Sequence, residues 1–202
     1  MEREIKLTAA EDRLFSAFNE ALSCYGASAS PETHEMHSVY YDFPDYSLRK
    51  NGLSVRFRAD NNAGYVTVKT GGANDGGVQI RSEWERPCDS LSSGLSLLPE
   101  KDCLSRILSL GRPEDLRPIA EIYFTRVCFT ARTDGAAVEF ALDRGFFNGD
   151  RNKRFAELEA ELKSGSIDAL KLISSRLADK YSLTFENNSK LARAISDAAG
   201  LT

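Results

Sequence analysis

Charged side chains recur at every second position in several short segments of this 202-residue chain. In the first of these, residues 2–7, Glu2, Glu4 and Lys6 alternate with a mostly apolar set. Successive side chains of a β-strand point to opposite faces of a sheet, whereas a helix would scatter these charges around its circumference. The segment therefore predicts a strand with one charged face and one mostly apolar face.

The same period of two occurs in five later segments. Their polar-phase residues are Ser54, Arg56 and Arg58; Tyr65, Thr67 and Lys69; Gln79, Arg81, Glu83 and Glu85; Glu139 and Asp143; and Glu157, Glu159, Glu161 and Lys163. The last of these segments, 154–163, consists of strong helix formers. Its strict alternation and the turn residues on both sides nevertheless favour a strand.

Alternation of this kind is most simply explained by an antiparallel sheet with one face in water. Two features favour a different arrangement. Almost every polar position is ionisable, and the two signs are segregated, with carboxylates on the first and last strands and cations on 53–60 and 65–70. The few predicted helices also need apolar strand faces to cover, which would leave the charged faces inside. We therefore predict an α+β fold, an eight-stranded antiparallel closed β-barrel or tunnel with helices packed outside.

The chain is expected to form a single domain over residues 1–202, without internal repeats. The predicted strands are 2–7, 34–43, 53–60, 65–70, 78–86, 119–131, 136–147 and 154–163, and the predicted helices are 10–24, 102–110, 167–180 and 189–199.

Composition limits the binding partners and the cellular compartment that we expect for this protein. The net charge of −4 provides no general basic field for nucleic acid or an anionic membrane. The four cysteines are scattered, without metal-binding spacing, which is typical of a reducing compartment. No signal peptide and no bilayer-length apolar run is evident. We expect a cytoplasmic protein without a membrane or nucleic-acid partner.

An interior lined by both positive and negative side chains favours one class of ligand. Cations bind a polyanion, and carboxylates bind hard divalent ions through oxygen. A phosphate chain accompanied by Mg²⁺ or Mn²⁺ needs both. The sequence therefore predicts a small-molecule triphosphate as the ligand and Mg²⁺ or Mn²⁺ as the cofactor.

Glu2-x-Glu4-x-Lys6 resembles the ExExK signature of the CYTH superfamily, also called triphosphate tunnel metalloenzymes. Seven further pieces follow in the family's order: "YYDFPDYSL", "GLSVRFR", "VTVKT", "IRSEWE", "VEFALDRG", "ELEAELKSG" and "NNSKLARA". Together they cover nearly the whole chain. The resemblance implies an eight-stranded antiparallel tunnel with helices outside, in agreement with the alternation.

The resemblance also implies roles for individual residues. It implies metal ligands at Glu2, Glu4, Glu157, Glu159 and Glu161. It implies phosphate-binding cations at Lys6, Arg56, Arg58, Lys69, Arg81, Arg126 and Lys190. It implies catalytic groups at Glu83, Asp143 and Lys190. Arg126 shares its strand phase with Ile122 and Phe124, so we expect a bulge or local twist before it.

The leading hypothesis is a metal-dependent triphosphatase that hydrolyses inorganic triphosphate or a small organic triphosphate. One alternative within the family is a class IV adenylyl cyclase, which converts ATP to cyclic AMP and pyrophosphate. A second alternative is a polyphosphate-binding or nucleotide-binding module without turnover. An RNA 5′-triphosphatase is disfavoured by the sequence pI of about 5.4.

Overall fold

The computed structural model describes residues 1–25, 30–133 and 135–198. The strands are β1 Glu2–Thr8, β2 Glu32–Asp42, β3 Leu53–Asp60, β4 Ala63–Thr70, β5 Ala73–Asp75, β6 Val78–Arg81, β7 Glu83–Pro87, β8 Arg117–Thr133, β9 Ala136–Phe147, β10 Arg154–Gly165 and β11 Thr184–Phe185. The α-helices are α1 Glu11–Cys24, α2 Ser47–Lys50, α3 Leu91–Ser96, α4 Ser105–Leu108, α5 Ile167–Tyr181 and α6 Lys190–Ala198. A π-helical turn, Glu100–Leu104, precedes α4, and a 3₁₀ turn covers Pro113–Asp115. The last residue of the predicted helix 189–199 lies outside the described residues.

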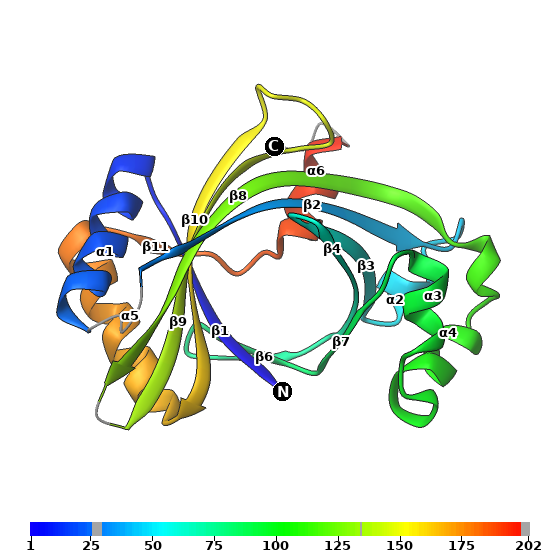
Figure 1. The fold of residues 1–202 in the computed structure, drawn as a ribbon, viewed down its shortest axis with the longest axis horizontal. Coiled ribbons are helices and arrows are strands. Elements are labelled where there is room, and N and C mark those ends of the chain that lie inside the picture. The colour runs from blue at the N-terminus through cyan, green and yellow to red at the C-terminus, as the bar shows by residue number, and fades with distance from the viewer. Residues whose placement is uncertain (26–29, 134, 199–202) are drawn as a thin grey trace.

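All strands belong to one sheet, and its pairs are antiparallel. The order is β5-β6-β1-β10-β9-β8-β2-β3-β4-β7, and β11 pairs with β1. The strands curve into a ring (Figure 1). The predicted α+β class and its antiparallel sheet are confirmed. β5 and β11 are short additions to the expected strands.

The hydrogen-bonded order does not close into a continuous barrel, because β5 and β7 at its two ends are not paired with each other. The predicted strand 78–86 instead divides at Ser82. Its first part pairs with β1, and its second part pairs with β4. The amide of Thr70 also donates to the Ser82 carbonyl over 3.0 Å. The chain at Ser82 therefore connects β6, the strand next to one end of the sheet, with β7 at the other end.

The segment of helix formers is a strand, as its alternation predicts. β10 pairs on one side with β1 and on the other with β9. Glu157 lies opposite Asp143, and Glu159 lies opposite Lys6 of β1. Tertiary pairing on both edges therefore overrides the helix propensity of this segment.

Helices cover the outer face of the sheet in two separate places. α1 and α5 bury Leu14, Phe18 and Leu177 in an apolar cluster with outward residues of β1, β8, β9 and β10. α3 and α4 cover β3 and β4 on the opposite side of the ring (Figure 1). In the described residues, no helix is long and apolar enough to cross a membrane.

The helix α6 departs from the predicted arrangement, because it packs on the inner face. Leu191 and Ala194 are buried with Ile122 and Phe124 of β8. The pairing of β8 with β9 runs without a register shift from Ile122 to Thr133. No bulge therefore lies between Ile122 and Arg126 in this ladder, and the register shift of β8 against β2 falls earlier, between Pro118 and Ala120. The inner face of β8 becomes apolar where α6 covers it, so Ile122, Phe124 and Arg126 can share one phase.

Candidate functional site

The inner faces of the strands enclose a cavity of about 310 Å³. Its lining is mostly ionisable: Glu2, Glu4, Lys6, Tyr40, Ser54, Arg56, Arg58, Lys69, Arg81, Glu83, Glu85, Phe124, Arg126, Glu139, Glu159, Glu161, Lys163, Ser189, Lys190 and Leu191. We call this space the tunnel cavity. It brings together all the predicted site residues except Asp143 and Glu157. Those two lie behind its wall, each with 0% of its surface exposed.

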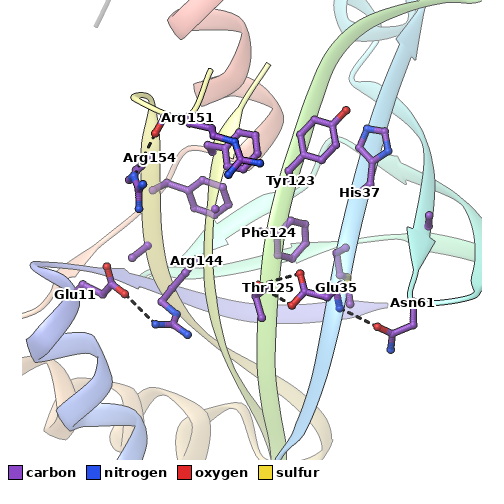
Figure 2. A pocket seen from close by; sticks show the side chains of 16 residues that line it. Glu11, Glu35, His37, Asn61, Tyr123, Phe124, Thr125, Arg144, Arg151 and Arg154 are labelled. Carbon is purple, nitrogen blue, oxygen red and sulfur yellow. Dashed lines mark hydrogen bonds and ion pairs between the residues drawn. The ribbon is translucent and has the colours of Figure 1, made fainter. Parts of the chain in front are cut away.

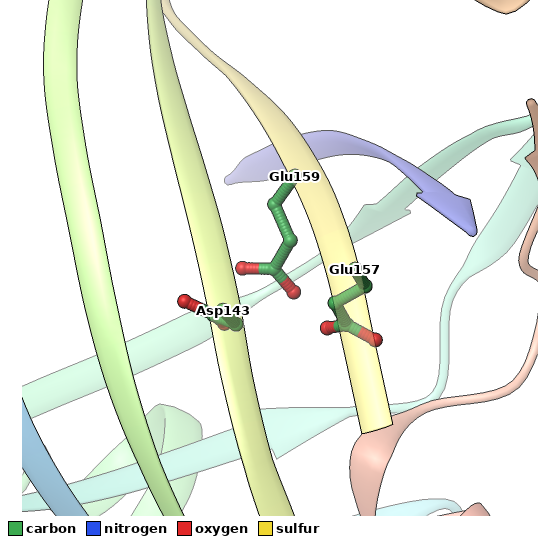
Figure 3. A group of neighbouring side chains, drawn as sticks. All are labelled: Asp143, Glu157 and Glu159. Carbon is green, nitrogen blue, oxygen red and sulfur yellow. The ribbon is translucent and has the colours of Figure 1, made fainter. Parts of the chain in front are cut away.

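The deepest charged group gathers around the ammonium of Lys190, the first residue of α6. Its Nζ lies 2.7 Å from Asp143 Oδ2 and 2.9 Å from Glu159 Oε1, and it also contacts Glu157 Oε1. The three carboxylates come from the neighbouring strands β9 and β10 and lie close together (Figure 3). Because Lys190 also lines the tunnel cavity, its ammonium can contact either the carboxylates or a guest.

Arg126 of β8 neutralises two of the same carboxylates. Its Nε and Nη2 donate to the two oxygens of Asp143, each over 2.7 Å, and Nη2 lies 2.5 Å from Glu159 Oε2. Arg126 and Asp143 are directly opposite each other in the β8–β9 ladder. The bidentate geometry therefore follows from strand register, and such pairs are among the strongest hydrogen-bonded ion pairs in proteins.

A second charged group joins β1 to β4 and β6. Lys69 Nζ lies 2.8 Å from Glu2 Oε1 and Arg81 Nε lies 2.6 Å from Glu2 Oε2, and Arg81 also contacts Glu4. Lys6 Nζ donates to Glu4 Oε1 over 2.6 Å. In this group every carboxylate is paired with at least one of the cations predicted to bind phosphate.

A third group lies on β3, β4 and β7. Arg56 donates to the Thr67 hydroxyl over 3.0 Å, and that hydroxyl donates to Glu85 Oε2 over 2.9 Å. Arg58 Nη2 also donates to Glu85, over 3.1 Å. Glu85 is therefore the acid that pairs with both Arg56 and Arg58 in the tunnel cavity.

Three further acids, Glu83, Glu139 and Glu161, complete the lining. Glu83 lies 3.4 Å from the ammonium of Lys69. Glu161 is paired with Lys163 over 2.8 Å, and Lys163 also lies 3.1 Å from Glu139.

Burial and ion pairing shift the acids in opposite directions. Burial would raise the pKa of Glu2, but Lys69 and Arg81 outweigh it and lower that pKa to about 2. Burial likewise opposes ionisation of Glu159, yet Lys190 and Arg126 hold its pKa well below the usual value. For Glu83 and Glu157 burial wins, and the pKa of each carboxyl is raised.

The basic groups and one phenol are also perturbed. Burial and the neighbouring Arg56 lower the pKa of Arg58 to about 10. Burial would raise the pKa of Tyr40, but the cations Arg56, Lys69 and Lys190 lower it. The pKa of Lys190 is raised, because Asp143 and the two glutamates outweigh its burial.

The carboxylates around Lys190 have the composition of a site for a hard divalent ion. One oxygen from each of Asp143, Glu157 and Glu159 lies within 4.8 Å of the others. Mg²⁺ and Mn²⁺ prefer such oxygen ligands. The ammonium of Lys190 contacts all three carboxylates, so an ion at this point and the ammonium exclude each other. Glu2, Glu4 and Glu161 stand outside this three-carboxylate group.

Sequence reasoning missed three residues of this arrangement. Glu85 continues the period-two phase of Glu83, and Thr67 continues that of Lys69, so alternation marked both without a role. Arg193 contacts Glu157 Oε2 from α6. The sequence could have indicated Arg193, because it follows Lys190 by three residues and this spacing places both cations on one face of a helix.

A larger cavity of about 740 Å³ lies on the outer face of the sheet, between its two helical covers. It contains a stack of His37, Tyr123 and Phe146, with ring centroids 4.0 Å and 5.2 Å apart (Figure 2). Arg144 lines it and pairs with Glu11 at the surface. The charges here are mixed and largely exposed, unlike those of the tunnel cavity.

Fold and lining together define a β-tunnel protein with a charged interior. The profile of the CYTH domain matches residues 1–195, and the chain belongs to this family.

Two curated relatives resemble the chain in sequence. The inorganic triphosphatase of Haemophilus influenzae is 27% identical over 164 residues, which is 77% of this chain and 44% of that protein. An uncharacterized protein of Mycobacterium tuberculosis is 27% identical over an alignment of 222 residues, covering 96% of this chain and 40% of that protein. The chain thus spans less than half the length of these relatives.

Solved structures share the fold at lower identity. HpAC1 of Hippeastrum, described as an adenylyl cyclase candidate with a dominant triphosphatase activity, has a TM-score of 0.70 and 20% identity, covering 98% of this chain and 96% of that one. PH1819 of Pyrococcus horikoshii has a TM-score of 0.63 and 18% identity, covering 98% and 99%. The RNA triphosphatase domain of a mimivirus capping enzyme has a TM-score of 0.53 and 13% identity, covering 90% and 89%.

Proposed function

We propose that the tunnel cavity binds inorganic triphosphate or a small organic triphosphate and hydrolyses its terminal phosphoanhydride bond with the help of Mg²⁺ or Mn²⁺. The observation that carries the proposal is the pairing inside the cavity. The cations predicted to bind phosphate converge there from five strands and one helix, each held by carboxylates of the protein rather than by solvent. A polyanion entering with a divalent ion can replace both partners of these pairs at once.

The cations would hold the phosphate oxygens. The proposed phosphate-binding residues are Lys6, Arg56, Arg58, Lys69, Arg81, Arg126 and Lys190. They reach the cavity from different directions, so a linear chain of phosphates can be contacted along its length. Arginine suits this task, because its planar fork matches phosphate oxygens in pairs.

The carboxylates would hold the ion. Asp143, Glu157 and Glu159 form the group whose geometry fits a divalent ion, and Glu2, Glu4 and Glu161 are proposed to assist from the neighbouring strands. When bound, such an ion draws charge from the phosphate oxygens and so weakens the phosphoanhydride bond. Asp143 is bound on both oxygens by Arg126, which supports a positioning role rather than direct contact with water.

Glu83 is the proposed acceptor of a proton from the attacking water. It lines the cavity, and burial raises the pKa of its carboxyl, which makes the carboxylate a stronger base. The water oxygen forms the new bond to the terminal phosphorus, and the bond to the bridging oxygen breaks. Lys190 is proposed to stabilise the charge that develops on the phosphate oxygens.

The relatives and the lining both favour hydrolysis over cyclisation. A curated relative is named an inorganic triphosphatase. The aromatic side chains that line the tunnel cavity are Tyr40 and Phe124, which are only 8% and 5% exposed. Neither offers an open ring face on which an adenine could stack.

The test is product analysis with inorganic triphosphate, ATP and thiamine triphosphate, each incubated with Mg²⁺, Mn²⁺ or EDTA. We expect metal-dependent phosphate release, fastest from inorganic triphosphate and abolished by EDTA. Cyclic AMP and pyrophosphate from ATP would identify a cyclase instead. Tight binding of triphosphate without any product would identify a binding module. We also expect the protein to act in the cytoplasm.

A further inference from the structure

The helix α6 presents two cations to one buried carboxylate. Lys190 contacts Glu157 Oε1, and Arg193 contacts Glu157 Oε2. Glu157 has no exposed surface, so both of its oxygens depend on these partners. The loss of counter-ions from a buried carboxylate strongly destabilises the folded protein.

The two cations differ in what else they can reach. Lys190 lines the tunnel cavity, whereas Arg193 does not. The guanidinium of Arg193 lies over the rings of Phe147 and Phe155, 5.7 Å and 5.4 Å from their centroids. Arg193 is therefore held on the far side of Glu157, away from any guest in the cavity.

The proposed function requires Lys190 to turn toward phosphate. That movement takes the ammonium away from Glu157, Asp143 and Glu159. Asp143 and Glu159 have a second cation in the structure, because Arg126 donates three hydrogen bonds to them. Arg193 is the cation that remains on Glu157.

We propose that Arg193 is a positioning residue that keeps Glu157 neutralised and thereby frees Lys190 to bind the substrate. This inference rests on the proposed function. Without Arg193, Glu157 would depend on the incoming divalent ion alone once Lys190 turned away, so Lys190 would stay on the carboxylate more often and bind phosphate more weakly.

The same helix supplies a matched control. Lys153 lies 2.9 Å from Asp197 near the end of α6, and it also donates to the Asp197 carbonyl over 3.3 Å. This pair helps to dock α6 but does not contact Glu157 or line the tunnel cavity. Lys153→Gln therefore loosens the docking of the helix without disturbing the carboxylate group.

The experiment compares Arg193→Gln, Arg193→Lys, Lys153→Gln, Lys190→Gln and the double variant Lys190→Gln/Arg193→Gln. Calorimetry with Mg²⁺ and imidotriphosphate, a non-hydrolysable analogue, measures binding, and phosphate release from inorganic triphosphate gives KM and kcat. We expect Arg193→Gln to weaken binding and raise KM about tenfold with a smaller change in kcat. Arg193→Lys should recover most of the affinity, and Lys153→Gln should change it less than about twofold.

The double variant isolates the route through Lys190. If Arg193 acts by freeing Lys190, its loss should weaken binding less than about twofold once Lys190 is already glutamine. An equal effect in both backgrounds would overturn the inference, as would Lys153→Gln matching Arg193→Gln. Thermal melting of each variant separates these outcomes from unfolding. A wild-type protein that neither binds the analogue nor releases phosphate would overturn the proposed function, and the inference with it.

Discussion

The two cavities lie on opposite faces of the same strands, β8, β9 and β10. The outer cavity is larger, about 740 Å³ against about 310 Å³. Its ion pair between Arg144 and Glu11 is exposed, with 45% and 61% of the side-chain surfaces in contact with water. On the inner face, Arg126 and Asp143 have 16% and 0% exposed.

This difference shows why volume is a poor guide to function here. An exposed ion pair has a small desolvation cost, and its contribution to the free energy of folding is equally small. A buried one carries a large desolvation cost that only close pairing offsets. A fold selected for stability alone would fill the interior with apolar side chains. The tunnel cavity instead keeps buried charges together, which is the arrangement expected where a charged guest must be bound.

The largest effect should come from removing inner carboxylates. Glu159→Gln/Glu161→Gln deletes two of the proposed ion-binding charges and should lower the rate of phosphate release by about 10²–10³-fold. The outer-face control is Glu35→Gln, which lines the larger cavity and should stay within about twofold of wild type. Rates are measured with inorganic triphosphate and Mg²⁺. Wild-type rates in the double variant would contradict the mechanism.

The next largest effect should appear when two ion pairs are compared, one on each face of β9, at the adjacent residues Asp143 and Arg144. Arg126→Gln leaves Asp143 buried without its bidentate partner and should lower the free energy of unfolding by about 3–5 kcal/mol. Arg144→Gln removes an exposed pair on the outer face and should cost less than about 1 kcal/mol. Urea denaturation measures both. Equal losses would mean that the inner pair is no more buried in solution than the outer one.

Much of this contrast could be predicted from the sequence, because alternation assigns each residue to a face of its strand. The period of two correctly predicted a strand at residues 154–163, although their helix propensity is high. It also put Glu2, Lys6, Arg56 and Glu159 on one interior surface.

What alternation could not predict depends on contacts between distant segments. Local sequence does not show that α6 packs inside, so the apolar residues Ile122 and Phe124 in the phase of Arg126 led to the expectation of a bulge or local twist. The depth of Asp143 follows from its pairing with Arg126 across β8 and β9 and from the covering α6. Arg193 acquires its partner from β10, and nothing in the spacing of either segment identifies the other.

Lowering the pH should lower the free energy of unfolding through protonation of Glu2 on the inner face. The pKa of Glu2 falls from the usual 4.5 to about 2 on folding, since Lys69 and Arg81 outweigh its burial. A lowered pKa in the folded state contributes stability above the unfolded value of 4.5. That contribution, up to about 3 kcal/mol, is lost as pH falls from 4.5 toward 2. Urea denaturation at several pH values should show a wild-type advantage over Glu2→Gln that shrinks across this window. An advantage that stays constant down to pH 2 would contradict the assignment.

The smallest effect should come from the aromatic stack of the outer cavity. Tyr123→Leu removes the ring between His37 and Phe146 and the hydroxyl that donates to Glu121 over 2.7 Å. It should lower the free energy of unfolding by about 1 kcal/mol, because a partly exposed stacked ring contributes little beyond its buried area. Phosphate release should be unchanged, since Tyr123 lines the outer cavity (Figure 2) and does not line the tunnel cavity. A drop in rate of about tenfold or more, with the fold intact by circular dichroism, would show that the two faces are coupled through β8 rather than independent.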